Sequence, residues 1–120
     1  MYVNVIICIY LLAFLIATST HSYDLYIGGF LPYVKSPLWA NIYWTSLTFL
    51  DPLSIIILLV NIRIGLVFYI LIIVSDVIIN IYFTISSHGF LGLINLFMIC
   101  QILFLIILLV TVKQVWQVMQ

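Results

Sequence analysis

The sequence predicts an all-α fold, a polytopic membrane protein built as a four-helix bundle in a single domain. Composition is the first observation behind this prediction. The 120 residues are 68% hydrophobic and 5% charged, whereas water-soluble domains carry about 25% charged residues. The second observation is that the apolar residues gather into four long stretches, at 2–18, 38–60, 64–85 and 90–112. Because so little polar material is left to cover a surface in water, we expect the chain to lie in a lipid bilayer.

The first stretch, residues 2–18, is near the lower limit of about 17 apolar residues for a helix that crosses a bilayer core about 30 Å thick. A cleaved secretory signal is the alternative, because Ala17 and Ser19 are small enough to mark a cleavage site. Residues 1–5 contain no Lys or Arg, so the basic region of such a signal is missing. We therefore expect a helix that is retained.

Residues 19–37 form the long connection that follows, and we expect them to be an outer loop. The segment contains residues that interrupt a continuous helix, namely Gly28, Gly29, Pro32 and Pro37. Its several aromatic residues suggest that the loop lies on the membrane surface or caps the bundle.

The three remaining stretches, 38–60, 64–85 and 90–112, are each long enough to cross the bilayer as a helix at about 1.5 Å per residue. Inside lipid, every backbone N–H and C=O must find a partner within the chain, which only helices and closed barrels provide. Residues 54–60 and 102–110 do not alternate between polar and apolar, as the strands of a barrel would. We therefore predict helices.

Four spans place both chain ends on the same side of the membrane. Arg63, between the second and third spans, and Lys113 lie on that side, and Lys35 lies on the other. Because cytoplasmic loops carry the excess of Lys and Arg, we expect a multi-pass protein of the cell membrane with both termini in the cytoplasm. The zero net charge argues against nucleic acid as a partner. Without a GxxxG motif, the sequence leaves open whether copies of the chain form a homo-oligomer.

Two carboxyl groups fall inside the apolar stretches, Asp51 in the second and Asp76 in the third. A carboxylate at the bilayer centre costs about 2.5–3.5 kcal/mol, so each should face the interior of the bundle. Both lie about 18–20 Å from the turn at Arg63 by helix rise, and antiparallel packing would bring them to one level. Two such groups cannot both ionise cheaply, so we expect at least one to carry a proton. No Lys, Arg or His is predicted at this depth.

Other polar residues share helix faces with these acids, at about 100° per residue. Pro52 removes a helical hydrogen bond and frees a carbonyl one turn from Asp51, which is typical of helices that line a membrane cavity. The predicted ligand-binding residues are Asp51, Asp76, Asn80, Thr48, Trp44 and Tyr69.

The sequence offers no motif for a metal, a cofactor or a catalytic centre. His21, Asp24 and His88 should be exposed on the outer connections, and they lack the spacing of three or four metal ligands. No HExxH segment and no phosphate-binding glycine loop occurs. We therefore expect neither metal nor cofactor, and catalytic residues stay unassigned.

The favoured function is binding or transport of a small ligand, apolar or cationic, or of a proton, at Asp51 and Asp76, because ionisable residues inside a membrane usually mark such sites. A structural or assembly subunit of a membrane complex is the alternative, with hydrogen bonds between helices worth about 0.6 kcal/mol each. A membrane enzyme that acts on an apolar, lipid-like substrate through an Asp acid–base pair is a second, less favoured alternative.

Two segments, Leu47–Leu53 (LTFLDPL) and Ser75–Asn80 (SDVIIN), resemble the emopamil-binding (EXPERA) group of membrane proteins. That group carries Gly-Pro at the first place and Gly-Asp-Val at the second. Leu96–Met98 is similar to part of its last helix, and the resemblance extends over residues 45–115. It implies a cavity for a flat apolar ligand between the helices.

The resemblance does not imply isomerase activity. The isomerases of the group use acidic residues earlier in their helices, and Tyr43 stands nearest to one of those positions. The pattern of His followed by an acid in the preceding helix is echoed by His21 and Asp24. The same signature resembles more closely a family of small four-helix bacterial integral membrane proteins.

Overall fold

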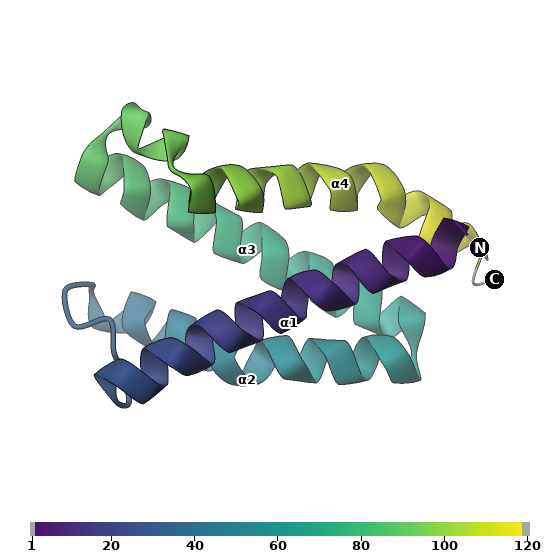
Figure 1. Cartoon of the computed structure of the whole chain (residues 1–120), viewed down its shortest axis with the longest axis horizontal. Helices are drawn as coiled ribbons and strands as arrows, with labels where there is room; N and C mark the ends of the chain where they lie inside the picture. Colours follow the sequence, from purple (N-terminus) through teal and green to yellow (C-terminus); the bar gives the residue numbers. More distant parts are fainter. Residues whose placement is uncertain (1, 119–120) are drawn as a thin grey trace.

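The computed structural model of the chain describes residues 2–118 and consists of four long helices joined by short connections (Figure 1). These are α1 (Tyr2–Gly28), α2 (Leu38–Val60), α3 (Ile62–His88) and α4 (Leu96–Val118), and a short 3-10 helix, η1 (Phe90–Ile94), precedes α4. No strand occurs among residues 2–118. Each long helix has the length and apolar composition to cross a membrane. The predicted all-α fold with four such helices is confirmed.

The outer surface of the bundle is apolar. Large hydrophobic side chains are exposed on every long helix, among them Leu12, Leu59, Leu71 and Leu109. In water this much exposed hydrocarbon would favour aggregation, whereas lipid tails solvate it. The surface therefore fits a multi-pass membrane protein.

The helices pack as a ring, in which each contacts its neighbours in the order α1, α2, α3, α4 and back to α1. α2 and α3 form an antiparallel hairpin connected by Asn61, whose side chain caps α3 by accepting a hydrogen bond from the N–H of Ile64 at 3.1 Å. Gly65 allows the two helices to approach closely, because a Cβ there would lie 2.4 Å from the Cα of Leu58. A larger residue would force the hairpin apart.

The connection after the first helix is shorter than predicted. Residues 19–37 are not all loop, since α1 continues to Gly28. The hydroxyls of Ser19 and Thr20 donate to carbonyls one turn back in α1, which these side chains do readily within helices. The helix ends only at Gly29, where φ is +77°, a conformation that suits glycine. The prediction was wrong because the breakers at its end were taken to describe the whole segment.

Two further boundaries also differ. α3 extends beyond the predicted 64–85 at both ends, and α4 begins at Leu96 instead of Phe90. Residues 90–94 form η1, and the Oδ1 atom of Asn95 then accepts a hydrogen bond from the N–H of Met98 at 2.9 Å. This N-terminal cap sets the start of α4.

Figure 1 shows that α1 crosses the bundle obliquely. It begins beside the end of α4 and diverges from it, so that its last turns lie next to the start of α2. We call the end of the bundle where α1 begins and α4 ends the closed half. The other end, which carries the loop 29–37, is the open half.

Aromatic side chains fill the centre of the closed half. The rings of Phe14 and Tyr69 stack with centroids 3.7 Å apart, and Tyr10 stacks on Tyr69 at 5.3 Å. The Tyr69 hydroxyl donates to the backbone carbonyl of Tyr10, and the Tyr10 hydroxyl bonds to that of Thr111 at 2.5 Å. Side chains of α1 and α3 therefore meet across the bundle, and no space is left between them.

Candidate functional site

A cavity of about 640 Å³ lies in the open half, where α1 has separated from α4. Its walls come from α1, α3 and α4, with one residue of α2 and two of the loop. Phe14 and Phe104 border it on the side of the closed half. The polar side chains that line it are Thr20, His21, Asp24, Tyr33, Ser36, Asp76, Asn80 and Gln101.

Asp76 of α3 is the buried carboxyl group on the cavity wall, with 8% of its surface exposed. Its Oδ1 atom accepts a hydrogen bond from the Asn80 amide at 3.1 Å, and its Oδ2 atom accepts one from the Gln101 amide at 3.0 Å. Asn80 also donates to the Gln101 Oε1 atom at 3.1 Å. This ring of three side chains fixes the carboxyl group.

Trp44 of α2 completes this arrangement. Its indole N–H donates to the Oδ1 atom of Asn80 at 3.0 Å, so the Asn80 side chain is bonded at both its oxygen and its nitrogen. The Trp44 ring packs edge-on against Phe83, with centroids 5.1 Å apart. Beside it, the hydroxyls of Tyr43 and Ser75 form a second bond between α2 and α3, 2.6 Å long.

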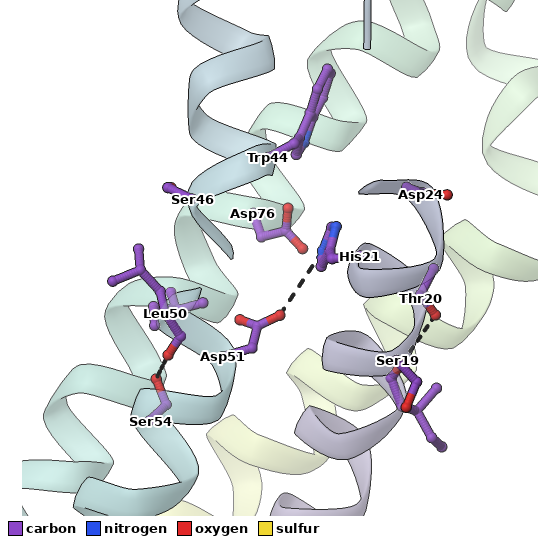
Figure 2. Close-up of polar contacts among 12 residues, drawn as sticks. Ser19, Thr20, His21, Asp24, Trp44, Ser46, Leu50, Asp51, Ser54 and Asp76 are labelled. Carbon is purple, nitrogen blue, oxygen red and sulfur yellow. Dashed lines mark hydrogen bonds and ion pairs between the residues drawn. The ribbon is translucent and has the colours of Figure 1, made fainter. Parts of the chain in front are cut away.

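Asp51 of α2 is buried, with 2% exposure, and faces His21 of α1 (Figure 2). The Nε2 atom of His21 lies 3.9 Å from the Oδ2 atom of Asp51. Asp51 and Asp76 are close enough for their charges to interact, and Figure 2 shows both carboxyl groups turned toward the region of His21. The expectation that no His lies at this depth was therefore wrong, because it rested on α1 ending at residue 18.

A third acid, Asp24 near the end of α1, lies in the same region and contacts Tyr33 of the loop. The Tyr33 hydroxyl donates to the Oδ2 atom of Asp24 at 2.7 Å and lies 3.1 Å from the Nδ1 atom of His21. Asn41 holds the loop in place, since its side chain bonds to the Tyr33 N–H and to the Leu31 carbonyl. Burial, and then the hydrogen bond and negative charge of Asp24, raise the pKa of the Tyr33 hydroxyl. Tyr33 therefore keeps its proton at neutral pH.

The structure brings together some of the predicted residues. Asp76, Asn80 and Trp44 line the cavity, and Asp51 lies beside it against His21. The Thr48 hydroxyl is buried and has no hydrogen-bond partner among the described residues. The sixth predicted residue, Tyr69, belongs to the aromatic centre of the closed half.

Sequence reasoning missed His21, Asp24, Tyr33 and Gln101 as members of the site. The first three were assigned to an exposed loop, but His21 and Asp24 lie on α1 and face the cavity. Gln101 is a polar residue inside an apolar stretch, which was a signal available in the sequence.

The acids of the chain lie at one end of the bundle and most of its basic residues at the other. All three acids lie in the open half, together with Lys35 of the loop, whereas Arg63 and Lys113 lie toward the closed end. The Arg63 guanidinium lies over the Trp116 ring, 5.7 Å from its centroid. No Lys or Arg of residues 2–118 lines the cavity. The cavity is therefore a region of negative potential whenever its carboxyl groups are ionised.

No set of three His, Cys, Asp or Glu within residues 2–118 could hold a metal ion. No protein-family model, curated protein or solved structure matches this chain. The resemblance to the EXPERA group therefore stays a prediction from the sequence.

Proposed function

We propose that the protein binds a small amphipathic cation in the cavity of the open half, within the membrane. The observation that carries this proposal is Asp76, a buried carboxyl group held on the cavity wall by Asn80 and Gln101 with no Lys or Arg of the described residues facing it. Burying a carboxylate is costly unless a positive charge or hydrogen bonds compensate. A cationic group in the cavity would supply that charge.

The rest of the cavity suits the apolar part of such a ligand. Phe14, Phe97 and Phe104 line it together with Trp44, and aromatic faces attract cations as well as hydrocarbon. Its volume of about 640 Å³ falls in the range of about 300–1,000 Å³ that is usual for ligand sites. The ligand class is therefore a compact cation with an aromatic or aliphatic body.

The divergence of α1 from α4 supports entry from the side. The cavity lies between these two helices, and Cys100 and Phe97 of α4 are both exposed on its wall. A ligand dissolved in the bilayer would reach Asp76 by passing between the helices. In this proposal the protein lies in the cell membrane with the closed half, which carries Arg63 and Lys113, on the cytoplasmic side.

The rival interpretation is that the protein is a structural subunit. In that role, the hydrogen bonds among Asp76, Asn80 and Gln101 would serve only to hold the helices together. That role leaves the cavity unexplained, because a purely structural bundle gains packing energy by filling such a space. The charge and volume of the cavity therefore favour ligand binding.

The test uses two probes of the same size and opposite charge, tetraphenylphosphonium and tetraphenylborate. Each is titrated into the full chain in nanodiscs of neutral lipid, with empty nanodiscs as the blank. We expect saturable binding of the cation only, and we expect Asp76→Asn to weaken it by about tenfold or more, the effect of about 1.4 kcal/mol of lost charge interaction.

Gln114→Leu is the control for this variant. Gln114 is exposed on α4 in the closed half, so its replacement should leave binding unchanged. Equal binding of both probes, or unchanged cation binding by a folded Asp76→Asn protein, would contradict the proposal. Loss of stability without any binding by the native chain would favour the structural role.

A further inference from the structure

A chain of hydrogen-bonding groups connects the loop to the buried acid of α2. Tyr33 donates to Asp24 at 2.7 Å, the Tyr33 oxygen lies 3.1 Å from the His21 Nδ1 atom, and the His21 Nε2 atom lies 3.9 Å from the Asp51 Oδ2 atom. Asp24 is near the end of α1, beside the loop, whereas Asp51 is buried between the helices. The chain of groups therefore extends from the outer end of the bundle into its interior.

The geometry determines where the proton of His21 lies. A phenol has one proton, and that of Tyr33 is directed at Asp24. The Nδ1 atom of His21 must therefore be the donor in its contact with the Tyr33 oxygen. This leaves Nε2 as the nitrogen that gains or loses a proton, and Nε2 is the atom that faces Asp51.

We propose that a proton moves between Asp51 and Asp24 through His21 and Tyr33, and that cation binding in the cavity expels one proton by this path. The inference rests on the proposed cation site and adds the residues that couple it to protons. The separation of 3.9 Å between His21 and Asp51 exceeds hydrogen-bond length by about 1 Å. A small rotation of either side chain closes it, so the contact works as the step that opens and closes.

The proton count balances at every step. The carboxylic acid of Asp51 gives its proton to Nε2 of His21, which leaves a carboxylate and an imidazolium. The imidazolium gives its Nδ1 proton to the Tyr33 oxygen while the Tyr33 hydroxyl proton passes to the Asp24 carboxylate. Asp24 then releases that proton to water. One proton leaves, Asp51 is left ionised, and His21 is left neutral with its proton on Nε2. Return of a proton along the same path restores the starting arrangement.

Cation binding drives this release through charge. A positive ligand beside Asp76 favours the ionised form of Asp51 and disfavours a positive His21, so the proton is expelled outward. No Lys or Arg of the described residues lines the cavity to oppose this effect. The titratable groups that surround His21 and Asp51 are Asp24 on α1, Tyr33 in the loop, Tyr43 on α2, Tyr69 and Asp76 on α3, and Cys100 on α4.

The test counts protons released when tetraphenylphosphonium binds to the full chain in weakly buffered nanodiscs that contain a pH-indicator dye. We expect about one proton per bound cation near neutral pH, by charge linkage. Binding without proton release would overturn the coupling and leave the cation site standing. Absence of binding would overturn both.

Two variants test the path itself. His21→Gln keeps polar atoms but cannot carry a mobile proton, so proton release, counted per bound cation, should become about tenfold slower or more than in the native chain. His88→Gln, at the exposed end of α3, is the matched control and should release protons as the native chain does. Release by His21→Gln at the rate of the native chain would overturn the path.

Nitrogen NMR of His21 gives a second measurement that needs no ligand. The neutral ring should carry its proton on Nδ1, and Tyr33→Phe should move it to Nε2, because the acceptor for the Nδ1 proton is gone. Tyr26→Phe, at an exposed position of α1, should leave it unchanged. A native His21 protonated on Nε2 in its neutral form would overturn the inference.

Discussion

The closed and open halves of the bundle use the same helices but differ in what lies between them. In the closed half, Tyr10, Phe14 and Tyr69 are buried and fill the centre. In the open half, α1 has moved away from α4, and the space between them is a cavity of about 640 Å³ lined by apolar side chains together with several polar ones. The difference shows that one oblique helix can provide a packed core at one end and leave a cavity at the other.

The two halves also satisfy their polar groups differently. Hydroxyls of the closed half bond to a backbone carbonyl or to each other, as Tyr69 does with Tyr10 and Tyr10 with Thr111. In the open half, carboxyl and amide groups bond to one another at the cavity wall, as Asp76 does with Gln101. The side-chain carboxyl groups are therefore confined to the half that has room for a ligand.

The largest expected effect is loss of packing in the closed half. Phe14→Ala removes a ring that is 1% exposed and stacks on Tyr69, so we expect the free energy of unfolding to fall by about 3 kcal/mol. Phe97→Ala removes a ring that is 56% exposed at the cavity and should cost less than about 1 kcal/mol. Unfolding in mixed micelles, followed by circular dichroism, measures both, and equal losses would remove the distinction between the halves.

The next effect concerns how closely the helices approach. Gly65→Ala places a Cβ 2.4 Å from a backbone atom of Leu58, and such overpacking costs about 1–3 kcal/mol. Gly92→Ala in the open half meets the Cβ atom of His88 at 2.7 Å and the methyl group of Thr84 at 3.0 Å. These contacts are less severe than the one with the Leu58 backbone and should cost less. The same unfolding measurement compares them. If Gly92→Ala proved the more damaging, the closed half would not be the rigid one.

A smaller loss is expected where amides hold the acid. Gln101→Leu removes one donor to Asp76 and should lower the free energy of unfolding by about 0.6–1.7 kcal/mol, the measured range for bonds between membrane helices. Gln114→Leu, exposed on the same helix, serves as the control. No difference between the two variants would mean that the ring on Asp76 does not contribute to stability.

The smallest expected effect is a pH dependence of stability that arises from Tyr33 in the loop 29–37. The raised pKa of Tyr33 in the folded chain means that its contribution to stability is complete below the usual tyrosine pKa of about 10 and is lost as the pH rises further. Tyr33→Phe should therefore reduce the fall in stability between about pH 9 and 11, and Tyr26→Phe should not. If stability fell with pH as steeply in Tyr33→Phe as in the native chain, the raised pKa of the Tyr33 hydroxyl would be contradicted.

Several elements could be predicted because a local pattern determines them. The run of apolar residues around Asp51 and Asp76, and the equal distance of these acids from Arg63, predicted two acids on adjacent helices, and the structure brings them near each other. His21 could not be placed in this way. Its position depends on how far α1 continues past residue 18 and on the angle at which it crosses α2.

Tyr69 and Gln101 also show that the helix face predicted from the sequence does not identify a residue's neighbours. Tyr69 shares a predicted helix face with Asp76, yet its ring lies in the closed half against Phe14. Gln101 shares no face with the other polar residues of α4, yet it bonds to Asp76. Periodicity gives the face of a helix, but the neighbour of that face depends on the crossing angles of the whole bundle.

The amino-acid sequence by itself determined that this chain forms four apolar helices suited to lipid, because hydrogen bonding of the backbone and the cost of exposed hydrocarbon act on each segment separately. Only the tertiary structure decided that α1 leans away from α4, that a cavity opens there and that His21 meets Asp51. Those features arise from contacts between residues far apart in the chain, and such contacts form only when whole helices pack together.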